Sequence, residues 1–323
     1  MAQEVKISHG IIVLPPGRHG RIGHEGLRRW LSRGQLSFAE PDAEMLVRVT
    51  GMIGANVPEA GLAGLRFWGQ TGERSGSWMA AADPVHLETR LHSLRLRMLR
   101  PDELPRSDLR ELFEHLQSTL GSGADYSFTG LGHCGYLHST DAFATAPVSA
   151  SVLHGLPPDE YVPSPETART YHQLLGELQM ALHEHEVNKR RVAAGQPEIN
   201  SLWLWGGGVA PVAESRSLPM LIADDALFRG YWHSCRADGA DWGTDLDKIT
   251  SNFVAVMPEL PPADVELAMI ETLECVKRML ARGTIRSVTL LFRDGLSVQF
   301  NPWNALRLWR GESPLLQKNE END

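Results

Sequence analysis

Apolar positions along the chain follow two spacings, one typical of buried strands and the other typical of amphipathic helices. The apolar run in "VKISHGIIVLPPG" predicts a first strand that ends in a turn at residues 15–17, and "HEGLRRWLSRG" predicts a helix that ends at Gly34. The segment "GSWMAAADPVHLE" predicts a strand that enters a turn at Asp83-Pro84. The chain therefore opens with a strand, a loop and a helix, as α/β domains do.

Longer helices are predicted where apolar residues recur every three or four positions. One such face after Ser107 comprises Leu109, Leu112, Phe113, Leu116 and Leu120. The strongest pattern begins near Glu166 and comprises Tyr171, Leu174, Leu175, Leu178, Ala181, Leu182 and His185, which places His185 on an apolar helical stripe. A last helix in "ADVELAMIETLECVKRMLARG" ends at Gly283, and "SVTLLFRDGLSVQF" predicts a hairpin at Asp294-Gly295.

Glycines and prolines mark the boundaries between these elements. The stretch up to about Leu153 suggests β structure, and it ends in "GLPPDEYVPSPE", whose four prolines indicate a domain boundary. "NSLWLWGGG" predicts a buried strand that runs into Gly206, Gly207 and Gly208. These glycines either let the backbone approach another group closely or form a flexible joint. We expect the polar tail at residues 316–323 to be disordered.

Composition favours a globular protein of the cytoplasm. Of the 323 residues, 42% are hydrophobic and 22% charged, and no apolar run reaches the length of a membrane-spanning helix. The N-terminus carries no secretory pattern, and the three cysteines are scattered, so we expect a cytoplasmic protein with reduced thiols. The net charge of −9 argues against nucleic acid as a partner, and we expect no membrane partner.

Local motifs alone predict no reaction. "GLGHCG" at residues 130–135 has the spacing of a dinucleotide-binding loop, but no helix pattern follows it. The histidines of His183-Glu184-His185 lie on different faces of a helix, so we expect no metal there. Asp83 and His86 could form an acid–base pair, although an Asx-turn role for Asp83 is the simpler interpretation.

A longer pattern appears in "HEVNKRRVAAGQPEINSLWLWGGG", residues 185–208. It resembles the "HPVN…R…G…P.AN…L…G.G" stretch of the archaeal-type cofactor-independent phosphoglycerate mutases, which belong to the alkaline phosphatase superfamily. "IIVLPPG…LRRWLSRG", "ADPVHL" and "ALFRGYW…AMIETLECVKRML" resemble segments of that family in the same order. Nearly the whole chain also resembles a bacterial group of RpfE-type regulatory proteins, in which "ADPVHL", "QMLLH.HPVN" and "NSLWLWGGG" recur.

The resemblance to the mutases implies an α/β fold, an alkaline-phosphatase-like three-layer α/β/α sandwich with a smaller inserted α+β domain. The core would comprise residues 1–90 and 166–315, and the insertion residues 91–165. On this interpretation "SLWLW" returns the chain to the central sheet, and Gly206 to Gly208 form a loop beyond a strand end, where α/β folds place ligands.

The mutases depend on two divalent metals and a serine nucleophile, and the matching positions here differ. The first strand ends in "LPPG", with no acid between it and Glu25. The nucleophile region corresponds to "DAEMLVRVTGM", residues 42–52, which lacks serine and histidine, and "VMPELPPAD", residues 256–264, lacks the family's metal-binding histidine. We therefore expect no metal, no other cofactor and no mutase reaction.

The residues that match the family pattern include His185, Asn188, Arg191 and Asn200. In a structural account, Asn188 caps a helix and Arg191 bridges to a carboxylate. In a functional account, Arg191 and the N–H groups of the three glycines bind an anion.

The favoured hypothesis is a metal-depleted, non-catalytic relative of the mutases with a regulatory role, which binds a small anionic or phosphorylated ligand or a protein partner. The alternative is a phosphotransferase or hydrolase with a relocated active site. Its candidate groups are Asp83, His86, His133, His138 and His185.

Overall fold

The computed structural model describes residues 7–90, 93–123, 125–166, 168–183, 185–301, 303–304, 307 and 310–317. The chain divides into two compact units, a first unit of Met1–Ala55 and Ala213–Asp323 and a second unit of Asn56–Val212. The second unit is thus inserted into the chain of the first. It is longer than the insertion expected at residues 91–165, because the strands at residues 79–89 and 201–208 pair with each other inside it.

The first unit is built on a seven-stranded sheet with the order β2-β12-β11-β1-β10-β8-β9. Its strands are β1 (Ile7–Leu14), β2 (Gln35–Phe38), β8 (Met220–Ala223), β9 (Gly239–Ala240), β10 (Phe253–Val256), β11 (Ile285–Phe292) and β12 (Leu296–Phe300). β1 pairs in parallel with β10 and β11, and β10 pairs in parallel with β8. The carboxyl ends of these four strands therefore meet at one edge of the sheet.

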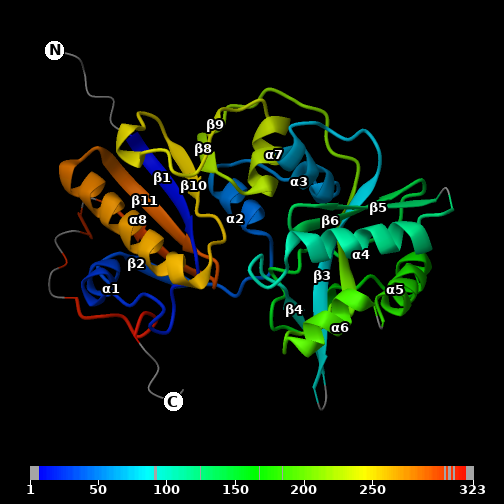
Figure 1. Ribbon diagram of the computed structural model, residues 1–323. Coiled ribbons are helices and arrows are strands. Elements are labelled where there is room, and N and C mark those ends of the chain that lie inside the picture. Colours follow the sequence, from blue (N-terminus) through cyan, green and yellow to red (C-terminus); the bar gives the residue numbers. More distant parts are fainter. Residues whose placement is uncertain are drawn as a thin grey trace. The chain divides into compact units, whose positions relative to one another are not determined.

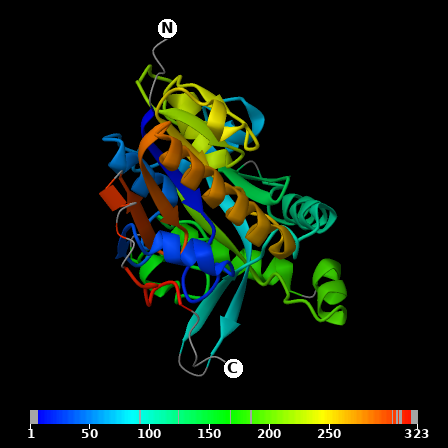
Figure 2. The same ribbon diagram turned by 90° about the vertical axis from the view of Figure 1, so that its left-hand side faces the viewer.

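Helices cover this sheet. They are α1 (Glu25–Leu31), α2 (Met45–Met52), α7 (Ala226–Ser234), the 3-10 turn η2 (Leu246–Lys248) and α8 (Pro262–Arg282). Figure 1 shows α8 lying along β1 and β11, and the turned view in Figure 2 agrees. Ile12 of β1 packs with Leu27 of α1 and Leu273 of α8 in one hydrophobic core. Ile11 and Val13 point to the other face and are buried too, as expected for strands of a parallel sheet.

The second unit contains a five-stranded antiparallel sheet. Its strands are β3 (Met79–Thr89), β4 (Leu94–Met98), β5 (Tyr126–Leu131), β6 (Cys134–Ser139) and β7 (Ser201–Gly208). Its helices are α3 (Leu62–Thr71), α4 (Arg106–Thr119), the 3-10 turn η1 (Asp159–Tyr161), α5 (Arg169–Leu182) and α6 (Glu186–Ala193). Ala82 of β3 packs in a core with α4 and α5, whereas Asp83 contacts Arg66 of α3. Because successive strand residues face opposite sides, α3 covers the other face of this sheet.

The mixed α/β class and several predicted elements are confirmed. α4 and α8 occur where apolar spacing places them, and α8 ends at Gly283 with a φ of 71°. β11 and β12 form the predicted antiparallel hairpin. None of the described helices combines the length and the apolar character needed to span a lipid bilayer.

Two strand predictions were wrong. β7, which contains "SLWLW", joins the sheet of the second unit by pairing with β3, and does not return to the parallel sheet. Gly206 to Gly208 lie inside β7, not in a loop beyond it. β3 also runs straight through Asp83-Pro84, because Pro84 pairs with Leu202 and no turn interrupts the strand.

The structure also differs from the predictions for His185 and for the C-terminal tail. His185 does not continue the apolar stripe of α5, because that helix ends at Leu182 and His185 is the N-cap of α6. Leu316, the first residue of the tail expected to be disordered, is buried in the core of the first unit. Residues 318–323 of that tail lie outside the described residues.

Candidate functional site

Asp83 is held in an ion pair in the second unit. Arg66 Nη1 lies 2.8 Å from Asp83 Oδ1 and donates to Oδ2 at 2.9 Å. Trp205 Nε1 donates to the same Oδ2 at 2.6 Å, and Arg66 Nη2 donates to the carbonyl oxygen of Gly135 at 3.0 Å. Burial opposes the charge of Arg66, but Asp83, Cys134 and Tyr136 act together against it and raise the pKa of Arg66. The Asx-turn expected for Asp83 is absent, since its oxygens bind two other elements.

The acid–base pair of Asp83 and His86 does not form. The two residues are three positions apart in β3 and therefore face opposite sides of the sheet. The Nδ1 atom of His86 instead lies 2.9 Å from the carbonyl oxygen of Glu198. Neither residue is placed to exchange a proton with the other.

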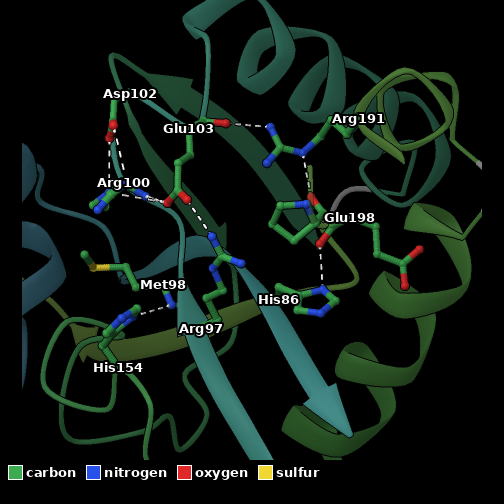
Figure 3. Close-up of polar contacts among 10 residues, drawn as sticks. His86, Arg97, Met98, Arg100, Asp102, Glu103, His154, Arg191 and Glu198 are labelled. Carbon is green, nitrogen blue, oxygen red and sulfur yellow. Dashed lines mark hydrogen bonds and ion pairs between the residues drawn. The ribbon is translucent and has the colours of Figure 1, made fainter. Parts of the chain in front are cut away.

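Arg191 is a buried connector between segments of the second unit (Figure 3). Its Nε donates to the carbonyl oxygen of Pro197 at 2.9 Å, and its Nη1 donates to the carbonyl oxygen of Glu103 at 2.7 Å. The bridge from Arg191 to a carboxylate, expected from the sequence, is therefore replaced by bonds to two carbonyls. Burial lowers the pKa of Arg191, and its buried Nη2 has no partner among the described residues.

The carboxylate of Glu103 does not bond to Arg191 but accepts hydrogen bonds from two other arginines. It accepts from Arg97 Nη2 at 2.6 Å and from the N–H of Arg100 at 3.1 Å, as Figure 3 shows. Burial acts against its charge, but the bonds from Arg100 and Arg97 lower the pKa of Glu103. These contacts, with that of Arg191, fix the loop that precedes α4.

Asn188 and Asn200 also serve the architecture of the second unit. Asn188 Nδ2 donates to the carbonyl oxygens of Leu182 and Ile199 at 3.0 and 2.9 Å, and its Oδ1 accepts from the N–H of Ile199 at 2.7 Å. Asn200 bonds through both side-chain atoms to the backbone of Leu87, at 2.7 and 3.0 Å. The structural account of these residues is the one that the contacts support.

The three glycines make close approaches, as one of the two interpretations proposed. Gly206 and Gly208 have φ angles of 62° and 145°, and a Cβ on Gly208 would lie 2.5 Å from the backbone nitrogen of Gly61. The N–H of Gly206 donates to Ala146 at 3.0 Å, and that of Gly207 donates to Thr145 Oγ1 at 2.8 Å. These two N–H groups are therefore already bonded, and they are not available to the anion site expected with Arg191.

The histidines considered for a relocated active site have separate partners. Val187 N–H donates to His185 Nδ1 at 3.2 Å, and the rings of His185 and His115 lie 4.6 Å apart. His133 Nδ1 lies 3.1 Å from the carbonyl oxygen of Leu104, and His138 packs edge-on against Phe67. The contacts therefore do not unite Asp83 and these histidines into one catalytic group.

A different set of polar residues lies at the carboxyl end of the parallel strands in the first unit. We call Arg18, Asp225, Arg293 and Asp294 the strand-end cluster. The ends of the strands are in register, with Leu14 beside Phe292 and Val256 beside both Val13 and Ala223. The cluster residues follow β1, β8 and β11 within a few positions, so the sheet itself brings them together. In α/β sheets this edge is where ligands bind.

The strand-end cluster contains charges that the protein satisfies only in part. Asp294 Oδ2 accepts from the N–H groups of Gly17 and Arg18, each at 2.8 Å, while its Oδ1 and Arg18 Nε are buried without a partner among the described residues. Arg293 Nη2 lies 3.8 Å from Asp225 Oδ2 and 3.4 Å from the carbonyl oxygen of Met257. Asp225 Oδ1 caps α7 through the N–H groups of Leu227 and Phe228.

Sequence reasoning missed this cluster, although a signal was present. "LPPGR" places Arg18 just after the turn that ends the first predicted strand, and "FRDG" places Arg293 at the end of another. The edge where parallel strands end was already the expected ligand position. The order of strands in the sheet was unknown, so the two segments could not be placed side by side.

The metal pair of the mutases does not fit the positions that correspond to its ligands. Leu14 at the end of β1 and Met257 after β10 are buried and apolar, and residues 45–52 form α2, which lacks serine, histidine and acids. Among the residues that the structure describes, no group of three or more His, Cys, Asp or Glu could hold a metal ion.

Comparison with known proteins gives a distant relationship. No protein-family model matches the chain. A Geobacter sulfurreducens protein named probable 2,3-bisphosphoglycerate-independent phosphoglycerate mutase is 30% identical over 106 residues, which are 32% of this chain and 26% of that protein. The mutase of Methanothrix thermoacetophila is 35% identical over 71 residues, 22% of this chain and 17% of its own length. The matched segments thus span about a quarter or less of these relatives.

A solved structure supports the fold. The PH0037 protein from Pyrococcus horikoshii superposes with a TM-score of 0.50 at 12% identity, over 92% of this chain and 88% of that one. The cofactor-independent phosphoglycerate mutase from Thermoplasma acidophilum gives a TM-score of 0.39 at 19% identity, over 92% of this chain and 90% of that one. From the sequence matches, the chain is distantly similar to the archaeal-type cofactor-independent phosphoglycerate mutases.

Proposed function

We propose that this protein binds a small phosphorylated metabolite at the strand-end cluster and acts as a regulatory, ligand-binding relative of the mutases without their phosphoryl-transfer chemistry. The observation that carries the proposal is the state of Arg293. Its side chain is 24% exposed, and its two contacts are long, at 3.8 and 3.4 Å. A guanidinium in this state remains able to form the short, paired bonds that phosphate oxygens accept.

The rest of the cluster supports an anion at this place. Asp294 is occupied with the N–H groups of Gly17 and Arg18 and so holds the loop after β1 in a fixed conformation. Arg18 stacks its guanidinium on the ring of Phe38, 3.9 Å from the centroid, and its buried Nε has no partner within the described part of the chain. Arg18 and Arg293 therefore lie near Asp294 and Asp225, whose carboxylates already accept hydrogen bonds from backbone N–H groups.

The residues proposed to bind the ligand are present in this chain, whereas the residues that carry out catalysis in the mutases are not, so we propose binding without catalysis. In the resemblance to the mutases, the end of the first strand supplies a metal-binding carboxylate, and this chain has Leu14, Pro15, Pro16 and Gly17 there. A regulatory role agrees with the resemblance to the RpfE-type bacterial proteins. The names of the curated relatives make phosphoglycerates the first ligands to test.

The experiment is calorimetric titration of the full chain with 3-phosphoglycerate, 2-phosphoglycerate and unphosphorylated glycerate. We expect a phosphoglycerate to bind and Arg293→Gln to weaken binding by about tenfold or more, as expected when one charge-assisted contact is lost. The matched control is Arg286→Gln, an exposed arginine at the opposite end of β11.

Three outcomes would overturn the proposal: no binding of either phosphoglycerate, equal binding of glycerate, or unchanged affinity in Arg293→Gln. Phosphate release or interconversion of the two phosphoglycerates, followed by NMR in the same samples, would favour the phosphotransferase or hydrolase alternative.

A further inference from the structure

A pocket of about 420 Å³ lies in the second unit, where β5 begins and β6 ends. Its wall includes Trp78, Asp125, Tyr126, Ser127, His138 and Thr140. This volume lies within the range of small-molecule sites. The pocket shares no residue with the strand-end cluster, so it is independent of the function proposed above.

The sheet fixes the wall of this pocket. Ser127 of β5 pairs directly with His138 of β6, and His138 pairs on its other side with Met79 of β3. Directly paired residues in antiparallel strands point to the same face, so the hydroxyl of Ser127 and the imidazole of His138 lie together. The N–H of Thr140 donates to the carbonyl oxygen of Asp125 at 3.1 Å, which closes the end of the β5–β6 pair.

His138 offers free polar atoms to the pocket. Its ring packs against Phe67, with centroids 6.1 Å apart and planes at 88°, and neither ring nitrogen is bonded to another described residue. Burial lowers the pKa of His138, so the imidazole is neutral at pH 7. A neutral ring presents one donor and one acceptor.

The charge around the pocket is negative. Asp125 lines it, and none of the described lining residues is a lysine or arginine. Burial and then the carboxylates of Glu177, Asp125 and Asp141 raise the pKa of Tyr126. A phosphate group would meet repulsion here, whereas a cation would be attracted.

An aromatic ring completes the wall. Trp78 is braced by Phe143, with ring centroids 4.6 Å apart. The ring of Tyr126, the next residue before Ser127, packs instead against the core of α4 and α5. Aromatic faces attract ammonium groups, most strongly where a carboxylate is also near.

We propose that this pocket binds a small organic ammonium compound with a hydroxyl group. Asp125 and the ring of Trp78 hold the cationic end, and His138 and Ser127 bond to the hydroxyl. The site thus takes a ligand of opposite charge to the one proposed for the strand-end cluster.

The test uses a pair of probes that differ in charge and scarcely in shape, choline and its neutral isostere 3,3-dimethylbutan-1-ol. Calorimetric titration of the full chain should show choline binding, with the isostere weaker by about tenfold, as expected from the loss of cation–π and carboxylate attraction. Phosphocholine should bind more weakly than choline, because its phosphate adds negative charge.

Variants locate the binding. Asp125→Asn removes the charge at an exposed position and should weaken choline binding about tenfold while the melting temperature stays the same. The control Asp159→Asn removes an exposed carboxylate of the same unit outside the pocket. The proposal is overturned if choline does not bind, if the isostere binds as tightly, or if Asp125→Asn and Asp159→Asn have equal effects.

Discussion

Arg66 of α3 and Asp83 of β3 form an ion pair between a helix and the sheet of the second unit, with Nη1 and Oδ1 2.8 Å apart. Their side chains are only 10% and 17% exposed. Removing one member of such a pair leaves the other charge buried and uncompensated.

We therefore expect Asp83→Ala to lower the free energy of unfolding by roughly 2–4 kcal/mol. Asp83→Asn should lower the free energy of unfolding by less, because the amide oxygen of the asparagine can still accept from Trp205 Nε1. Urea denaturation of both variants measures the difference, with Glu73→Ala, an exposed position just after α3, as the control. If Asp83→Ala unfolds at the same urea concentration as the parent, the ion pair contributes nothing to stability.

The loss of stability caused by substitutions at Gly207 and Gly208 of β7 should depend on the space available for a side chain at each position. A Cβ on Gly208 would meet the backbone of Gly61 at 2.5 Å, while one on Gly207 would meet the side chains of Thr145 and Trp78 at 2.8 Å. Because side chains can move and the backbone of α3's N-cap cannot, Gly208→Ala should destabilise more than Gly207→Ala, by about 1–3 kcal/mol.

Gly207→Val should destabilise the protein more than Gly207→Ala, since two more methyl groups enter the same space. Gly76→Ala is the control, because a Cβ there meets nothing within 4 Å. Thermal unfolding ranks the variants. Equal melting temperatures for the substitutions at positions 76, 207 and 208 would show that the run is a flexible joint.

His185 should make stability depend on pH. Burial and then the neighbouring His115 lower the pKa of His185, with Glu111 acting in the opposite direction. The unfolded chain then binds the proton more readily than the folded one, so stability is complete above the ordinary histidine pKa of about 6.5 and falls as pH decreases below it. Protonation also removes the acceptor for the N–H of Val187.

We expect His185→Ala to cost about 1 kcal/mol near pH 7.5, where the helix cap is lost. Between about pH 7.5 and 5.5 the variant should lose less stability than the parent. Urea denaturation at the two pH values tests this, with the exposed His183→Ala as control. A variant that loses as much stability as the parent on acidification would assign the pH dependence to other groups.

Metal removal should leave the protein unchanged. The positions that correspond to the mutase ligands hold Leu14, Pro15 and Met257, which offer no oxygen or imidazole side chain. We expect elemental analysis to find no stoichiometric Mn, Mg or Zn, and EDTA to leave the melting temperature the same. Two bound metals per chain would refute this expectation.

The elements that sequence predicted best are those whose signals are local. The apolar face of α4, the Gly283 end of α8 and the Asp294-Gly295 turn each depend on residues within one helix or hairpin. The sheet to which β7 belongs could not be predicted, because "SLWLW" is a buried strand in either sheet and its partner β3 is far away in the sequence.

The error at His185 has a different origin. α5 and α6 follow each other closely, so apolar spacing continues across the break between them. His183 has extended backbone angles, φ −62° and ψ 133°, which end α5. The sequence pattern singled out Asn188, Arg191 and Asn200, but their hydrogen bonds are made to backbone groups that only folding brings near.

The insertion of the second unit between the two segments of the first has a consequence for biosynthesis. Every strand of the second unit's sheet is complete once β7 has left the ribosome, whereas β1 must wait for β10 and β11, its partners, to be translated. We expect nascent chains arrested well beyond Val212 to resist protease in residues 56–212 while residues 7–55 are still cleaved. The strands β1 and β2, whose partners β10, β11 and β12 are translated after residue 212, would then fold after the unit that follows them in the chain.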